Sequence, residues 1–267
     1  MRDPQEVLGD LCVIALVNDD ASLARNLQTS DLLTRHGVPL HVERGAASAA
    51  IGYNAGLAAT TADIVVLAHQ DVYFPPDWHR QLADGIAAVE KVDPDWAVLA
   101  PFGMCAETDA HIGDVWSTSL SLRVGERVTA PRAVQSVDEL VIVLRRSSGL
   151  QFDPALPRYH LYGTDLIQTA WAAGKGAYVV PMPVVHNDDF KRALGRDFAE
   201  SYHFVRRKWR AALPLRTPVL WITRWGLGLP YQRLRAWRGL KVRRGMAGDT
   251  TVSPKVYAAQ CGWETAE

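Results

Sequence analysis

The chain has 267 residues, of which 48% are hydrophobic and 22% charged, and a formal net charge of zero, as is ordinary for a soluble globular protein with a sizeable core. Its three widely spaced cysteines include no CxxC pair, which fits neither a disulfide framework nor a structural zinc site and favours a reducing compartment. The first ten residues lack the apolar stretch of a secretion signal, so we expect a cytoplasmic protein.

The first part of the chain alternates short apolar strands with helical patterns. The run Leu11–Val17 is continuous and rich in β-branched residues, as expected of a strand buried on both faces. Asp20 is placed to cap a helix that continues to about Arg35. Strands are further predicted at Pro39–Glu43, Asp63–Ala68 and Trp96–Phe102, and helices at Ser48–Ala59 and after Pro76. This alternation predicts an α/β fold with a mostly parallel sheet flanked by helices.

The rest of the chain is less regular. Predicted elements are a strand or hairpin at Val115–Arg123, a strand at Val137–Arg145, a helix at Gly163–Ala173 and a short strand at Gly176–Val180. Helices are then predicted at Asp189–Ala212, Val219–Leu229 and Pro230–Arg244, followed by a poorly ordered end from Gly245. We therefore divide the chain into an α/β domain over residues 1–189 and a helical C-terminal extension over residues 190–267.

Polar side chains follow the predicted strands. Asn18–Asp20 follows the first strand, Glu43 ends the second, and His69–Asp71 follows the third. In open α/β sheets ligands bind outside the carboxyl ends of the strands, so these residues are placed to bind one. A strand that delivers Asp71 into a loop is how such a fold presents a carboxylate to a divalent cation, and a turn or capping role is the simpler alternative for this residue alone.

Two later residues are further candidates. Asp165 falls in the first turn of a predicted helix, where the helix dipole keeps a carboxylate ionised and able to accept a proton. A purely structural first-turn acid is the alternative. His186 follows the apolar pair Val184-Val185, and a lone histidine is more often structural than a ligand.

Taken together and in this order, these segments resemble the family 2 glycosyltransferases with the GT-A fold, which is Rossmann-like. They are most similar to the bacterial branch whose metal motif is His-Gln-Asp rather than Asp-x-Asp. The resemblance runs from about Leu11 to Asn187, two thirds of the chain. It is carried by Asn18-Asp19, Ala49–Gly56, His69–Tyr73, Val137-Asp138, Phe152-Asp153, Tyr162–Leu166 and Val185–Asn187.

The resemblance implies an inverting transferase that moves a sugar from a nucleotide-diphosphate sugar to a hydroxyl of a glycan or lipid-linked glycan, in cell-surface polysaccharide synthesis. It implies Mn²⁺ or Mg²⁺ as cofactor. Asp71 and His186 would hold the metal, and His69, which replaces the first acid of the usual pair, would contact the ribose or the metal as a neutral imidazole. Asp138 would face the donor sugar or the acceptor, and Asp165 would be the catalytic base.

Four further residues are carried over to the donor. Asn18, Asp19 and Glu43 would line the nucleoside pocket, and Asn54 would lie near the donor nucleotide, with a helix-packing amide as its alternative. Two other functions stay open. One is nucleotidyl transfer, although Asn18–Asp20 is not a glycine-rich phosphate loop. The other is a catalytically impaired sugar-nucleotide-binding or scaffold protein, because His69 stands where an acid is usual.

Charge is distributed unevenly along the chain. Residues 1–190 carry 24 acidic and 13 basic side chains, whereas residues 191–244 carry 15 basic and two acidic ones. Tryptophans are interleaved with these arginines, and no apolar span of about 20 residues is present to form a transmembrane helix. The extension therefore either contacts an anionic membrane, peripherally on its inner face, or packs on the acidic domain. Nothing resembles a nucleic-acid-binding module, so we expect no nucleic-acid partner.

Overall fold

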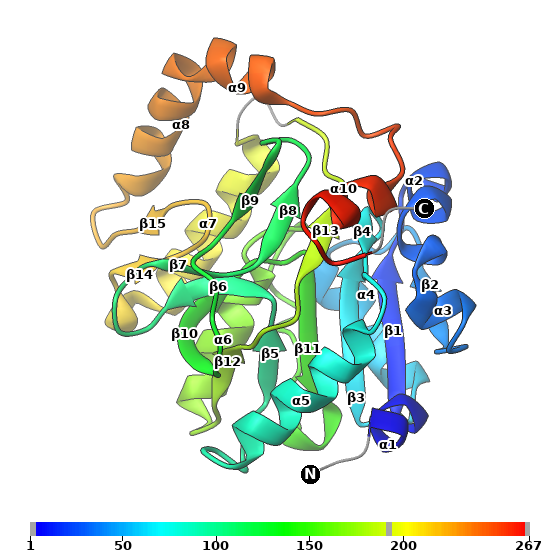
Figure 1. The fold of residues 1–267 in the computed structure, drawn as a ribbon. Helices are drawn as coiled ribbons and strands as arrows, with labels where there is room; N and C mark the ends of the chain where they lie inside the picture. Colours follow the sequence, from blue (N-terminus) through cyan, green and yellow to red (C-terminus); the bar gives the residue numbers. More distant parts are fainter. Residues whose placement is uncertain (1–3, 191–193, 265–267) are drawn as a thin grey trace.

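The computed structural model describes residues 4–190 and 194–264 (Figure 1). Its centre is a nine-stranded sheet with the order β2-β1-β3-β11-β5-β12-β10-β6-β7. In that order the strands are Leu40–Glu43, Leu11–Leu16, Ile64–His69, Val141–Arg145, Val98–Ala100, Ala177–Val179, Arg132–Val137, Phe102–Cys105 and His111–Gly113. β1 pairs in parallel with β2 and β3, and β12 pairs in parallel with β5. β11 runs antiparallel between β3 and β5, and β10, β6 and β7 form an antiparallel end.

Helices cover both faces of this sheet, so the predicted α/β class is confirmed (Figure 1). One face packs against α1 (Pro4–Gly9), α2 (Asp20–Arg25), α3 (Asp31–Thr34) and α5 (Trp78–Glu90). The other packs against α4 (Ala49–Ala59), α6 (Tyr162–Ala172) and α7 (Arg196–Lys208). Because side chains alternate along a strand, Val13 enters the first core and Ile14 the second, which is why β1 is apolar throughout.

The glycine at position 56 lets α4 lie close to β1. A Cβ atom there would stand 2.6 Å from Cγ2 of Ile14. The small-residue pattern of this helix is therefore a packing feature, which fixes the end of β1 and the polar loop that follows it.

A second, four-stranded sheet brings the candidate residues together. Its order is β4-β13-β8-β9, with bounds Val72–Tyr73, Val184–His186, Val115–Ser117 and Leu122–Val124. β8 and β9 form the hairpin predicted at 115–123. β13 pairs antiparallel with β4, and the register places His186 opposite Val72.

The predicted helix from Asp20 to Arg35 is wrong in its length and in its cap. Asp19 caps α2 by accepting bonds from the backbone N–H groups of Ala21 and Ser22. The chain then continues through a short 3₁₀ turn at Leu27–Thr29 into α3.

The helix predicted at Val219–Leu229 is also wrong. β14 (Leu215–Arg216) and β15 (Trp221–Ile222) form a hairpin there, and the hydroxyl of Thr217 accepts bonds from the backbone N–H groups of Val219 and Leu220. Such local side-chain bonds compete with a helix and favour a turn. Two further 3₁₀ turns lie at Arg146–Ser148 and Arg210–Ala212.

The extension continues as α8 (Gly228–Arg238) and α9 (Leu240–Met246), which arch away from the body of the molecule (Figure 1). The predicted poorly ordered end is wrong, because α10 (Pro254–Gln260) packs beside the second sheet. There Tyr257 stacks on Trp116 with ring centroids 5.2 Å apart, and the hydroxyl of Tyr73 donates to Glu264 over 2.8 Å.

The boundary at residues 189 and 190 stays a prediction. Phe198, Tyr202 and Val205 of α7 belong to the same buried cluster as α4 and α6, so the start of the extension shares the core of the α/β domain. No helix within residues 4–190 and 194–264 combines the length and the apolar character needed to cross a bilayer.

Candidate functional site

Three predicted residues meet at the carboxyl end of β3. His69 ends β3, Asp71 lies in the turn before β4, and His186 ends β13. One potential ligand atom from each lies within 4.8 Å of the other two. Nε2 of His186 is 3.4 Å, and Nδ1 of His69 is 4.0 Å, from Oδ1 of Asp71. The pairing of β13 with β4 and the bond from the backbone N–H of Asn187 to the carbonyl oxygen of Asp71 create this juxtaposition.

The donor set suits a divalent transition metal. Oδ1 of Asp71 is buried and makes no close hydrogen bond among the described residues, so its charge is compensated only by His186 at 3.4 Å and His69 at 4.0 Å. A cation at this point would satisfy it. Two imidazoles with one carboxylate are a donor set that can hold a divalent metal ion.

The electrostatics of the cluster follow from burial and from charge. Burial alone would raise the pKa of Asp71, but the neighbouring charges of His186 and His69 outweigh it and lower that pKa well below the ordinary value. Burial would lower the pKa of His186, but Asp71 and Asp188 outweigh it and raise it to about 10, so without a metal this imidazole is protonated and pairs with Asp71. A bound cation would have to displace that proton. For His69 burial dominates and lowers the pKa, so this imidazole is neutral, as a metal ligand requires.

A hydrogen-bond chain orients the ring of His69. Nε2 of His69 lies 2.9 Å from the hydroxyl of Tyr162, whose own proton is donated to the carbonyl oxygen of Glu139 over 3.1 Å. Nε2 of His69 therefore carries the proton, and the lone pair of Nδ1 points towards Asp71. Partners of this kind fix the tautomer of metal-binding histidines.

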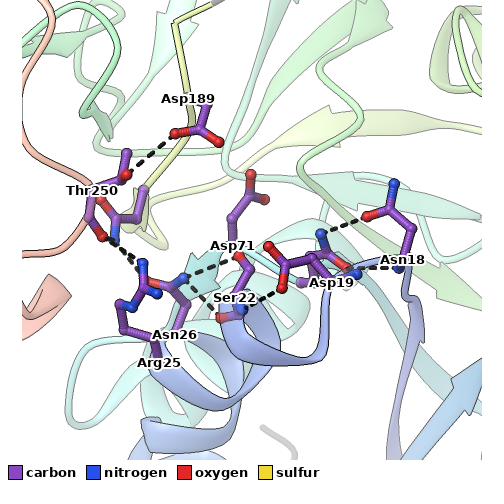
Figure 2. Close-up of a pocket in the computed structure, with 10 residues that line it drawn as sticks. Asn18, Asp19, Ser22, Arg25, Asn26, Asp71, Asp189 and Thr250 are labelled. Atoms are coloured by element: carbon purple, nitrogen blue, oxygen red, sulfur yellow. Dashed lines mark hydrogen bonds between the residues drawn. The ribbon is translucent and has the colours of Figure 1, made fainter.

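A polar cavity of about 350 Å³ opens beside Asp71 (Figure 2). It is lined by Asn18, Asp19, Ser22, Arg25, Asn26, Gln70, Asp71, Asn187, Asp189 and Thr250. Gln70 ties its wall together, because its Oε1 accepts from the backbone N–H groups of Asn18 and Asp19 and its Nε2 donates to Oδ1 of Asn18. The middle residue of the His-Gln-Asp motif thus connects the ends of β1 and β3.

The predicted nucleoside residues separate into two groups. Asn18 and Asp19 line the cavity, as a donor pocket at the sheet edge requires. Glu43 bonds to Nε2 of His41 over 2.8 Å and is not among the lining residues. Asn54 bonds through both its amide nitrogen and its amide oxygen to the backbone of Phe152, as its packing alternative expects, and its contact with the donor stays a prediction.

The carboxylate of Asp165 is buried and contacts the C-terminal extension. Its side chain is 1% exposed, Nζ of Lys208 donates to Oδ2 over 2.9 Å, and Nε1 of Trp209 donates to Oδ1 over 2.7 Å. Both oxygens are thus bonded to residues of the extension. In this conformation Asp165 anchors the end of α7, and its role as catalytic base stays a prediction.

Asp138 lies closer to the cluster. Its charge acts on both His69 and His186, and one of its oxygens accepts from the backbone N–H of Leu140, which leaves the other without a partner among the described residues. Glu139 beside it has a raised pKa, first because of burial and then because of the charge of Asp138. No local pattern in the sequence indicates Glu139, because its proximity to the cluster depends on the packing of β11 against β3.

Comparison with known proteins gives distant likenesses only. No protein-family model matches the chain. It is 27% identical over 152 residues to a Fuscovulum blasticum protein described as ATP synthase subunits region ORF 6, a match that spans 54% of this chain and 57% of that protein.

Solved structures with a similar arrangement are also distant. They include GalNAc-T7 with UDP, GalNAc and Mn²⁺ (TM-score 0.43, 12% identity, 76% of this chain and 51% of that one). A second is the mannosyltransferase PcManGT of Pyrobaculum calidifontis with GDP-Man and Mn²⁺, with a TM-score of 0.45 and 16% identity over 95% of this chain and 76% of that one. A third is TarS residues 1–349 of S. aureus, with a TM-score of 0.47 and 12% identity over 74% of this chain and 65% of that one. At these TM-scores the likenesses establish neither a family nor an activity for this chain.

Proposed function

We propose that this protein is a metal-dependent glycosyltransferase that uses a nucleotide-diphosphate sugar. The observation that carries the proposal is the cluster of His69, Asp71 and His186 beside a polar cavity at the carboxyl ends of the strands. The order of motifs along the sequence, which resembles family 2 glycosyltransferases of the GT-A fold, supports the same conclusion. The donor chemistry of two imidazoles favours Mn²⁺ over Mg²⁺.

The residues of the chain have separate tasks in this proposal. His69, Asp71 and His186 hold the cation, which, when bound, neutralises charge that develops on the departing diphosphate. Asn18 and Asp19 form the wall against the nucleoside, and Arg25 adds a positive charge to the cavity. Asp138, with one unpartnered oxygen beside the cluster, is the residue we propose to accept the proton of the acceptor hydroxyl.

The finer features of the reaction belong to the same proposal. Transfer by a single displacement inverts the anomeric configuration and needs no enzyme nucleophile, and the buried, fully bonded Asp165 does not offer one. We propose a glycan or lipid-linked glycan hydroxyl as acceptor, in the synthesis of a cell-surface polysaccharide.

A second candidate is a sugar-nucleotide-binding protein without transferase activity. The occupation of Asp165 by Lys208 and Trp209 favours it, because the resemblance assigns the catalytic base to that position. Both candidates require donor binding, and only the first requires turnover.

Nucleotide release separates the two candidates. Purified protein is incubated with UDP- and GDP-sugars, with Mn²⁺ or with a chelator, and free nucleoside diphosphate is quantified alongside donor binding by thermal shift. The transferase proposal expects Mn²⁺-dependent binding together with slow donor hydrolysis that Asp138→Asn abolishes. Binding without any release supports the second candidate, and a lack of Mn²⁺-dependent binding refutes both.

We also propose that the extension touches an anionic membrane surface. Leu234 and Trp237 are 45% and 71% exposed on α8, between Arg233 and Arg238. Exposed tryptophan and leucine beside arginine suit the headgroup region of a bilayer. Flotation with anionic vesicles tests this, because salt-sensitive binding that Trp237→Asp weakens is expected and equal recovery with neutral vesicles contradicts it.

A further inference from the structure

A large apolar groove lies between residues 219–246 of the extension, which we call the arch, and the rest of the protein. Its volume is about 1340 Å³. The apolar lining comes from the β14–β15 hairpin, from α8 and α9, and from Met104, Leu120 and Leu194 outside them. Figure 1 shows α8 and α9 standing away from the two sheets, on the side of the β14–β15 hairpin.

Several groove-lining side chains of α8, of α9 and of the residue before α8 are apolar and largely exposed, and they lie among polar ones. Leu227, Tyr231 and Val242 line the groove and are 65%, 67% and 68% exposed. Residues 228, 231, 235 and 239 also line it and recur at helical spacing, so one continuous helix face is directed to the groove. Apolar surface of this extent, with polar residues at its rim, is typical of a binding site.

The charge of the arch is entirely positive. Residues 219–246 contain seven arginine or lysine residues and no acidic residue. Arg235 lines the groove and has no ion-pair partner in the described part of the chain, whereas Arg216 is neutralised by Asp109 at 2.9 Å. A ligand complementary to this groove combines a long apolar portion with a negative charge.

One residue that lines the groove is close in sequence to residues that contact the surroundings of the candidate metal centre. Leu120 lines it, and the neighbouring residues Ser117 and Ser119 bond to Asp188, whose carboxylate stands 4.0 Å from Nδ1 of His186. The guanidinium of Arg243, also at the groove, lies 5.3 Å from the ring of Phe190.

The polar cavity lies close to the part of the groove at Arg243 and Phe190. Phe190 follows Asp189, which lines that cavity and accepts a bond from Thr250 on its far wall. The backbone N–H of Gly248, just beyond the arch, donates to the carbonyl oxygen of Thr118. Leu120 lines the apolar groove and Thr250 lines the polar cavity, so this bond joins the segment that carries the one to the segment that carries the other.

We propose that this groove binds a single-chain anionic lipid phosphate, with the hydrocarbon chain along the α8–α9 face and the phosphate near Arg235 and Arg243. This inference rests on the proposed function, because the bound lipid would be the carrier of the acceptor hydroxyl. The joined segments at 118–120 and 248–250 then place the polar end of the lipid on the side of the polar cavity. Recognition needs both parts of the ligand, since the apolar lining excludes a hydrated anion and the arginines discriminate against a neutral headgroup.

The test uses the full chain and dodecyl phosphate below its micellar concentration, with binding measured by isothermal titration calorimetry. Dodecyl maltoside supplies the same chain with a neutral headgroup, and inorganic phosphate supplies the anion alone. Tyr231→Asp changes the groove face, and Trp237→Asp, with 71% exposure close to the 67% of Tyr231, changes the opposite face of the same helix. Arg235→Gln in the groove is matched by Arg238→Gln, which does not line it.

Dodecyl phosphate is expected to bind wild type more tightly than either control compound. Tyr231→Asp and Arg235→Gln are each expected to weaken binding about tenfold, which corresponds to about 1.4 kcal/mol, while Trp237→Asp and Arg238→Gln stay within about twofold. Equal weakening by the groove and outer-face variants overturns the proposal. So does competition by inorganic phosphate alone, or binding only to vesicles with Trp237→Asp as the most sensitive variant.

Mn²⁺ and UDP binding, measured on the same samples, separates this proposal from the proposed function. Failure of lipid binding with intact Mn²⁺-dependent nucleotide binding refutes the lipid site alone. Lipid binding without any Mn²⁺-dependent nucleotide binding refutes the proposed transferase and leaves a lipid-phosphate site.

Discussion

Asp165→Asn tests whether this residue anchors the extension or removes a proton. The substitution keeps the shape of the side chain but removes the charge that Lys208 and Trp209 share. Removing one partner of a buried ion pair costs about 3–5 kcal/mol. Lys208 retains Asp153 at 2.8 Å and is 26% exposed, so part of its charge stays compensated. We therefore expect a loss of about 2–3 kcal/mol in the free energy of unfolding.

Urea unfolding followed by tryptophan fluorescence measures this loss, and nucleotide release from the donor is measured on the same preparations. Asp84→Asn, on the exposed face of α5, is the matched control and is expected to change the unfolding free energy by less than about 0.5 kcal/mol. Lys208→Met should destabilise the protein similarly to Asp165→Asn, and the double variant should lose less than the sum of the two. An Asp165→Asn protein with wild-type stability and no transfer would refute the anchoring role and restore the catalytic one.

Three further outcomes are expected. Asp71→Asn removes the only carboxylate of the cluster and should weaken Mn²⁺ binding by about tenfold or more, which a Mn²⁺ titration followed by thermal shift measures, and unchanged affinity contradicts the metal assignment. Gln70→Leu removes the acceptor of two exposed backbone N–H groups and should cost about 0.5–1.5 kcal/mol in urea unfolding while weakening donor binding, whereas wild-type values for both contradict its connecting role. The stability that Lys208 contributes, taken as wild type minus Lys208→Met, should be complete near neutral pH and decline on acidification. Asp165, whose pKa burial raises, is protonated first as pH falls through that raised value. Asp153, whose pKa the bond from Lys208 lowers, is protonated last, below its ordinary 3.8, and a difference that grows towards low pH contradicts this linkage.

The parts of the fold that depend on local pattern could be predicted from the sequence. β1 and β3 are continuous apolar runs buried on both faces, and each begins and ends within about two residues of its prediction. The position of Asp71 at the end of β3 follows from the same pattern. The sequence alone therefore places the His-Gln-Asp motif at the edge of the sheet.

Features that depend on distant contacts could not be predicted in this way. His186 reaches Asp71 only because β13 pairs with β4, more than a hundred residues earlier in the chain. The burial of Asp165 depends on Lys208 and Trp209, which lie more than forty residues later and show no local sign of that contact. Asn54 is likewise occupied by the backbone of Phe152, so its residue type alone could not distinguish a ligand contact from packing.

The C-terminal extension shows a different limit. Its sequence predicts a helix at Val219–Leu229, but the bonds of Thr217 favour a hairpin there. Beyond the arch, α10 is ordered by the stacking of Tyr257 on Trp116, a contact between the end of the chain and the second sheet. Composition indicated the positive charge of the arch correctly, because charge does not depend on the path of the backbone.

Pulsed electron paramagnetic resonance of the protein with one equivalent of Mn²⁺, with and without UDP, tests the metal centre most directly. The cluster predicts nitrogen couplings from two histidine imidazoles in wild type, loss of one coupling in His186→Ala, and an added phosphorus coupling when UDP is present. A spectrum of hydrated Mn²⁺ without nitrogen coupling, or a nucleotide-bound ion identical to Mn²⁺–UDP in buffer, would contradict the proposed metal centre.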